Sequence, residues 1–179
     1  MAFFTESKLR QFAASRAMER RSAQFLFESK EAAPLTVFLS HSHLDRVLAK
    51  GIVIHMGSLG VEVYVDWNDQ NMPRETNRLT ALMIKRRIRE ASLFVMLATK
   101  NALASRWVPW EVGIADAAKG QAQVLIIPVA DSLGVFRGRE FLRLYGRVEI
   151  ADDGDSAVFL PGKNAGGVAL ETYMEALGT

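Results

Sequence analysis

After Pro34 the sequence alternates between short apolar runs and longer amphipathic segments, and this alternation constrains the fold more than any other feature. The apolar runs, rich in β-branched residues, are residues 35–40, 61–65, 92–98 and 123–129. The segments with helical periodicity between them are residues 44–56, 76–91 and 105–119. Short apolar strands that alternate with helices indicate right-handed βαβ units. We therefore expect an α/β fold with a central parallel sheet of about five strands.

The remaining elements are predicted from pattern alone. A fifth strand is expected over residues 143–150 and a last helix over residues 165–177. The helix over residues 76–91 is expected to direct four apolar side chains to the core, namely Leu79, Leu82, Met83 and Ile88. Its basic residues, Lys85, Arg86, Arg87 and Arg89, are interpreted as a solvated face.

Residues 1–33 are predicted as an N-terminal helical extension that precedes a domain spanning residues 34–179. From residue 5 to residue 33, basic and apolar residues alternate in a loosely amphipathic pattern that ends at Pro34. The simplest interpretation is a helix packed on the main domain, and a self-association or docking helix is the alternative. A membrane-surface helix is disfavoured because four glutamates dilute the basic face.

Composition excludes several classes of function. The chain has no cysteine, which removes disulfides, thiolate nucleophiles and Cys-ligated zinc. The net charge is only +2, and no basic stripe is interleaved with aromatic residues, so we expect no nucleic-acid partner. No segment approaches the roughly 20 apolar residues of a membrane helix, and no secretory signal is evident at the N-terminus. We therefore expect a cytoplasmic protein without a membrane partner.

Open parallel sheets bind ligands outside the carboxyl ends of their strands. The search for a site therefore narrows to three loops: residues 40–45, 66–75 and 99–111. In the first loop, Ser42 and Asp45 have the spacing of a helix capping box. His41 and His43 are a weak ligand set without further histidines or cysteines nearby, so no metal site is predicted.

The second loop is polar and longer than the usual connection after a strand, which is typical of lids and binding loops. Trp67 lies just past the end of the predicted strand. Two interpretations stay open for this residue. It either covers the edge of the sheet or offers a flat face to a base or a nicotinamide ring.

The third loop is the most informative because two tryptophans and a glutamate fall within five residues, at Trp107, Trp110 and Glu111. Pro109 suits the first turn of a helix, so Glu111 is expected in that turn. There it could simply complement the helix dipole, which would also keep its carboxylate ionised. An ionised carboxylate beside aromatic surface at the carboxyl end of a strand could equally stabilise a developing cation.

Nucleophilic chemistry has less support. The sequence contains no GxSxG elbow, no Walker A motif and no GxGxxG fingerprint. Serine, histidine and aspartate are all present, but their spacing does not define a catalytic triad.

Taken together, three stretches resemble the Toll/interleukin-1 receptor (TIR) domain family over about residues 35–130. Residues 37–45 resemble its first box, and residues 63–67 with Met72 and Pro73 resemble its second strand and the following BB loop, in the Asp-Trp form of bacterial members. Residues 105–111 resemble the Ser-x-x-Trp-x-x-x-Glu stretch of members that hydrolyse NAD⁺. In Arg74 the chain departs from the family pattern, which often has glycine there.

The resemblance implies a flavodoxin-like three-layer sandwich and NAD⁺ glycohydrolase or ADP-ribosyl cyclase activity, with NAD⁺ as substrate and no cofactor. It places Glu111 at the position of the catalytic glutamate. The residues that it implies around the nucleotide are Ser40, His41, Asp66, Trp67 and Trp107. Those that it implies for the BB loop and for self-association are Asn68, Asp69, Met72, Pro73 and Arg74.

Two other functions stay open. The first is a non-catalytic adaptor that acts through contacts between TIR domains, although an adaptor has no need of Glu111 beside Trp107. The second is a nucleoside deoxyribosyltransferase, which also uses a glutamate at a ribose but would ignore NAD⁺. The sequence does not choose between a linear and a cyclic product.

Overall fold

Five parallel strands form the centre of the structure, a computed structural model that describes residues 2–28, 35–68, 77–131, 133–151 and 155–177. These strands are β2 (Thr36–Ser40), β3 (Glu62–Tyr64), β4 (Leu93–Ala98), β5 (Val124–Ala130) and β6 (Gly146–Ile150). Their spatial order is β3-β2-β4-β5-β6, and every neighbouring pair is parallel. This is the order of the flavodoxin-like doubly wound fold, which confirms the predicted fold class.

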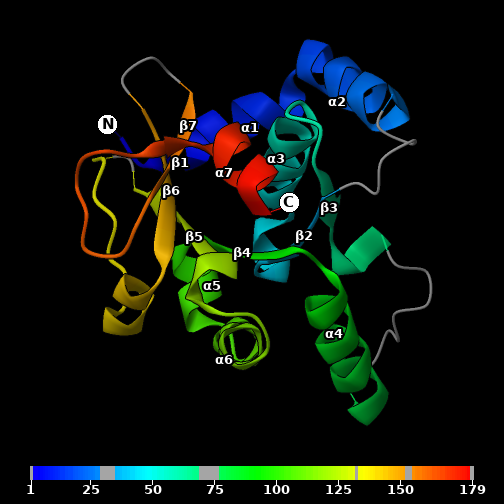
Figure 1. The fold of residues 1–179 in the computed structure, drawn as a ribbon, viewed down its shortest axis with the longest axis vertical. Coiled ribbons are helices and arrows are strands. Elements are labelled where there is room, and N and C mark those ends of the chain that lie inside the picture. The colour runs from blue at the N-terminus through cyan, green and yellow to red at the C-terminus, as the bar shows by residue number, and fades with distance from the viewer. Residues whose placement is uncertain (1, 29–34, 69–76, 132, 152–154, 178–179) are drawn as a thin grey trace.

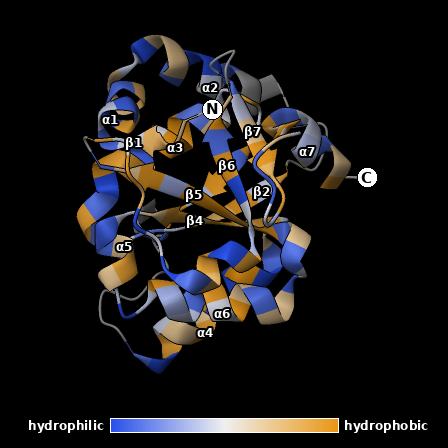
Figure 2. Ribbon diagram, turned by 90° about the vertical axis from the view of Figure 1, so that its left-hand side faces the viewer, coloured by the Kyte–Doolittle hydropathy of each residue, from blue (hydrophilic) through white to orange (hydrophobic). Residues whose placement is uncertain are grey.

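Helices cover both faces of the sheet, as Figure 1 shows. One layer contains α1 (Glu6–Ala14), α3 (Arg46–Gly57) and α7 (Leu170–Leu177), and the other contains α4 (Arg78–Glu90), α5 (Lys100–Ala104) and α6 (Val108–Ala118). The hydrophobic residues gather on the strands between the two layers (Figure 2). The core is therefore double, with one cluster of side chains on each face.

The side chains of β2 alternate between the two faces of the sheet, so the strand contributes to both core clusters. Val37 and Leu39 point into the cluster beneath α1 and α3, whereas Phe38 points into the cluster beneath α4 and α6. Successive side chains of a strand point to opposite faces. Ser40 therefore faces the same side as Phe38, toward α6, and this direction positions the candidate site.

The prediction for the helix over residues 76–91 was wrong about two side chains. Leu79 and Leu82 are 62% and 51% exposed, and the buried residues of α4 are Thr80, Ile84 and Ile88. The helix begins after Asn77, whose side chain caps it by accepting the backbone N–H groups of residues 79 and 80. The helix packs on the sheet through the face that carries every fourth residue from Thr80 to Ile88, and this leaves both leucines in solvent.

The helix predicted over residues 105–119 is confirmed as α6, and a short helix that was not predicted, α5, precedes it. The short helix α5 ends before Ser105, whose Oγ accepts the backbone N–H groups of Trp107 and Val108 at 3.1 Å and 3.3 Å. Helix α6 then begins at Val108, with Pro109 in its first turn as expected. A serine side chain that satisfies free N–H groups is a common way to start a helix.

The N-terminal segment forms a strand and two helices instead of one helix. Strand β1 (Phe4–Thr5) pairs with the end of β5, α1 follows, and α2 (Arg16–Glu28) begins after Ser15. Thr5 accepts the N–H of residue 8, and Ser15 accepts the N–H of Met18. Each hydroxyl caps a separate helix, which explains the break. Phe4 and Leu9 are fully buried in the core beneath α1 and α3.

The C-terminal part also differs from the prediction. The fifth strand is shorter than expected and is preceded by a 3-10 helix (Glu140–Leu144). Two antiparallel strands, β7 (Ser156–Phe159) and β8 (Val168–Ala169), extend the sheet beyond β6, and α7 begins only at Leu170. The extra strands are short, and β7 pairs with β6, the strand that precedes it in the chain.

Helices α1 and α3 approach so closely that Gly51 has no room for a side chain. A Cβ at Gly51 would lie 2.2 Å from the backbone carbonyl oxygen of Leu9. We expect Gly51→Ala to force the helices apart and to lower the free energy of unfolding by about 1–3 kcal/mol. Urea denaturation followed by circular dichroism measures this change.

Gly113→Ala is the matched control, because Gly113 lies on the exposed side of α6 and a Cβ there would meet no atom within 4 Å. This substitution should raise the stability by about 0.5–1 kcal/mol through helix propensity. Equal effects of the two substitutions would contradict the close packing of α1 on α3.

Candidate active site

Ser40 and Glu111 form the centre of the candidate site. Ser40 is the last residue of β2 and Glu111 lies in the first turn of α6, as the sequence predicted. The Ser40 hydroxyl donates a hydrogen bond of 2.5 Å to Oε2 of Glu111 across 71 residues of sequence. The bond lies at the carboxyl end of β2, next to β4, where the strand order reverses. This switch point is where open sheets of this type bind ligands.

The Glu111 carboxyl is nearly buried, with 8% of the residue exposed. Its pKa is raised to about 7: burial is the main cause, the hydrogen bond from Ser40 opposes the shift, and the nearby charge of Asp66 adds to it. The sequence predicts that the helix dipole keeps this group ionised. This prediction overestimates the effect of the dipole on the pKa of Glu111, because the loss of hydration outweighs the stabilisation of the charged form. At neutral pH the protonated and ionised forms are therefore comparable in population.

His41 follows Ser40 and is fixed by its surroundings. Its Nδ1 lies 3.0 Å from the carbonyl oxygen of Leu39, so Nδ1 carries the proton and donates a hydrogen bond to that oxygen. The Nε2 atom faces Oδ1 of Asp66 at 3.8 Å, and only 5% of the imidazole is exposed. Burial lowers the pKa of His41 below its usual value. The imidazole is therefore neutral at physiological pH, with Nε2 free to accept a hydrogen bond.

Trp67 lies beside His41 with the two rings edge to face, 4.5 Å between their centroids. The indole is half-buried and packs against the core beneath α3, which supports its interpretation as a cover for the sheet edge. The guanidinium of Arg46 lies 5.2 Å from the centre of the indole ring. Sequence analysis did not single out Arg46. The signal that could have found it is its position in the first turn of the helix after the first loop.

Trp107 lies one helical turn before Glu111, and its carbonyl oxygen accepts the backbone N–H of Glu111 at 2.9 Å. The Trp107 and Trp110 rings meet edge to face, with centroids 5.1 Å apart. Both indoles are half-buried and pack against the core beneath α6. The two indoles therefore form an aromatic pair at the start of α6.

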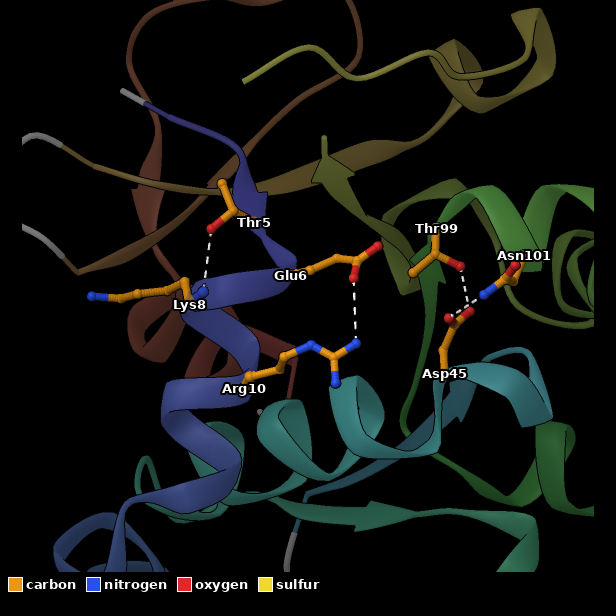
Figure 3. Close-up of polar contacts among 7 residues, drawn as sticks. All are labelled: Thr5, Glu6, Lys8, Arg10, Asp45, Thr99 and Asn101. Atoms are coloured by element: carbon orange, nitrogen blue, oxygen red, sulfur yellow. Dashed lines mark hydrogen bonds and ion pairs between the residues drawn. The ribbon is translucent and has the colours of Figure 1, made fainter. Parts of the chain in front are cut away.

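The first and third loops are joined through Asp45, which is 4% exposed. Figure 3 shows Thr99 and Asn101 directed at its carboxylate, with hydrogen bonds of 2.5 Å and 2.7 Å. The predicted capping box is therefore only half formed. Ser42 caps by accepting the N–H of Leu44 at 3.4 Å, whereas the Asp45 side chain is used by the third loop. Sequence analysis assigned no role to Thr99 or Asn101.

The remaining predicted residues belong to the loop after β3. Asp66 begins a 3-10 turn that ends at Asn68. Asp69, Met72, Pro73 and Arg74 lie outside the described residues, so the predicted BB loop stays a prediction.

Two further observations concern the described residues only. Within the ranges given above, no three histidine, aspartate or glutamate side chains gather as metal ligands. Over the same ranges, no helix has the length and apolar character needed to cross a bilayer.

A doubly wound parallel sheet with a buried carboxylate at its switch point defines the class of protein: an open α/β domain with a polar site at the carboxyl ends of its strands. Comparison with known families gives the assignment. Residues 37–154 match the TIR domain family, and the chain belongs to that family.

Two curated relatives carry names that describe an activity. A Bacillus cereus (strain MSX-D12) protein named 3′ cyclic ADP-D-ribose synthase ThsB′ is 32% identical over 111 residues, which cover 61% of this chain. A Cytobacillus dafuensis protein named cyclic ADP-D-ribose synthase TIR2 is 30% identical over 105 residues, which cover 50% of this chain. Both names mark the activity as provisional. The matches span 58% and 28% of the relatives' own lengths.

The raised pKa of Glu111 links folding stability to pH. A carboxyl whose pKa rises from 4.5 to about 7 on folding stabilises the protein fully below pH 4.5 and loses this contribution as the pH rises through 7. We expect Glu111→Gln to gain stability relative to the wild type across this window, by up to about 3 kcal/mol. Urea denaturation at several pH values measures the difference.

Glu62→Gln, made at an exposed glutamate of β3, is the control for effects that follow from any lost carboxylate. If the difference between Glu111→Gln and the wild type is the same at pH 4.5 and pH 8, Glu111 is not the buried, protonatable group described here.

Proposed function

We propose that this TIR domain cleaves the bond between nicotinamide and ribose in NAD⁺, with Glu111 as the catalytic carboxylate. The observation that carries the proposal is the buried hydrogen bond between Ser40 and Glu111 at the switch point of the sheet. The two curated relatives are named as cyclic ADP-D-ribose synthases, and these names support the same chemistry.

The reaction needs little from the protein at the leaving group. Nicotinamide departs as a neutral amine and takes the bonding electron pair with it, so no general acid is required. The barrier lies in the positive charge that develops on the ribose. An ionised Glu111 opposes that charge, and a carboxylate held in a nearly dry site stabilises the transition state more than the ground state.

Ser40 and His41 have supporting roles in this proposal. The Ser40 hydroxyl holds one carboxylate oxygen, which leaves Oε1 of Glu111 to face the sugar. The neutral imidazole of His41 can accept a hydrogen bond at Nε2 from a ribose hydroxyl. Asp66, Trp67 and Trp107 are proposed to form the remaining walls of the nucleotide site.

The second half of the reaction determines the product. Water that attacks C1′ gives ADP-ribose and releases a proton, which Glu111 can accept because its pKa is about 7. Attack by a nucleophile of the ADP-ribose itself gives a cyclic product and releases a proton in the same way. The names of the relatives favour the cyclic product.

Self-association in a signalling or defence role is part of the proposal. It is supported by family membership and by the two apolar side chains that α4 leaves in solvent, Leu79 and Leu82. A TIR adaptor without catalysis is the second candidate, and Leu79 and Leu82 would serve it equally well. The buried Glu111 distinguishes the two, because an adaptor gains nothing from a carboxylate that is costly to ionise.

We expect Glu111→Gln and Glu111→Ala to lower nicotinamide release from NAD⁺ by about 10²-fold or more, the effect of one preorganised electrostatic group. Chromatography of nicotinamide, ADP-ribose and cyclic products from concentrated protein measures the loss. Circular dichroism verifies that the fold is retained.

Glu175→Gln, on the exposed side of α7, is the control and should leave turnover unchanged. Wild-type turnover in the Glu111→Gln variant would remove Glu111 from the mechanism, and an inactive wild-type protein at every concentration would favour the adaptor.

A further inference from the structure

A groove of about 610 Å³ lies between α2 and α3 and ends at Trp67. Its walls are mostly apolar, with Ala23 on α2 and Val47, Val53 and Ile54 on α3. Pockets of this size and composition accept nucleoside-sized ligands. Helix α2 is outside residues 37–154, which match the TIR family, so one wall of the groove is an addition to the family domain.

Two cations line the same groove from one face of α3. Arg46 and Lys50 are one helical turn apart. The Lys50 ammonium lies 3.5 Å from the Glu19 carboxylate, an exposed pair that contributes little on its own. Within the described part of the chain, no carboxylate pairs with Arg46, whose guanidinium lies over Trp67. A guanidinium in this position is available to an anionic ligand.

Trp67 is the residue that connects the groove with the candidate active site, because it lines the groove and also contacts His41. The centroid of the Trp67 ring lies 4.5 Å from the centroid of the His41 ring. His41 in turn faces Asp66 at 3.8 Å, and the charge of Asp66 acts on Glu111. A ligand that extends from the candidate active site into the groove would therefore cross Trp67. The part of the ligand over Trp67 would lie next to Arg46.

We propose that this groove binds the adenosine half of NAD⁺ and that Arg46 binds the diphosphate. NAD⁺ joins its two nucleosides through a diphosphate, so its negative charge lies between the bond that is cleaved and the adenosine. In the protein, the Trp67 ring contacts both His41, which follows Ser40, and the Arg46 guanidinium, and Trp67 and Arg46 also line the apolar groove. The inference rests on the proposed function and assigns to α2 a role in nucleotide recognition.

Two substitutions test the groove. Arg46→Ala removes the cation, and Ala23→Trp fills the groove from α2. We expect each to raise the KM for NAD⁺ about tenfold, while kcat changes by less than about twofold. Arg46→Ala would lose one charge-assisted contact, and Ala23→Trp would block the space that the adenosine occupies. Nicotinamide riboside keeps the scissile bond but lacks the diphosphate and the adenosine. Its kcat/KM should be the same in the variants and the wild type.

Matched controls separate the groove from general effects. Ala17→Trp places the same bulk on α2 at an exposed position outside the groove, and Arg89→Ala removes an exposed arginine from α4. Neither should change the KM for NAD⁺. An unchanged KM in Arg46→Ala and Ala23→Trp, or an equal loss with both substrates, would overturn the inference.

Failure of the proposed function is distinguishable from failure of this inference. Calorimetry with ADP-ribose, which lacks nicotinamide, measures binding to the full chain whether or not turnover occurs. Affinity about tenfold lower in both variants than in the wild type supports the groove. Equal affinity in all three proteins overturns it, even if Glu111→Gln abolishes NAD⁺ cleavage.

Discussion

A carboxylate that loses its hydration on folding must be stabilised by the groups around it, and the bond from Ser40 to Glu111 supplies this stabilisation here. The hydroxyl and the first turn of α6 favour the charged form, whereas burial and the negative charge of Asp66 favour the neutral form. The balance places the pKa near 7. A group poised in this way can oppose a developing positive charge in one step and accept a proton in the next.

The rest of the structure holds the two partners of this bond in place. Ser40 is the end of a strand that is buried between two helical layers, so its position and direction are fixed by the sheet. Helix α6 is fixed by Val108, Val112 and Ala115, which pack into the core beneath it. The hydrogen bonds from Thr99 and Asn101 to Asp45 then tie the first loop to the third. The site is thereby preorganised by packing and by buried polar contacts.

Much of this arrangement follows from periodicity that the sequence displays. The alternation of strands and helices predicts the parallel sheet, and the period of two along residues 37–40 turns Ser40 toward α6, which carries Glu111. Other features depend on partners distant in sequence and have no local signal. The exposure of Leu79, for example, follows from how α4 meets the sheet. Similarly, Arg46 becomes notable only when Trp67 is placed beneath it.

The central claim is that ionised Glu111, held by Ser40, is the active form. The most direct test is the pH dependence of kcat/KM for NAD⁺ in the wild type and in Ser40→Ala. In the wild type, kcat/KM should rise with pH and level off above about 7. In Ser40→Ala the rising limb of the pH profile should move to higher pH, because the hydrogen bond that lowers the pKa of Glu111 is lost. A wild-type profile that is flat from pH 5.5 to 8.5, or a limb that stays in place in Ser40→Ala, would contradict it.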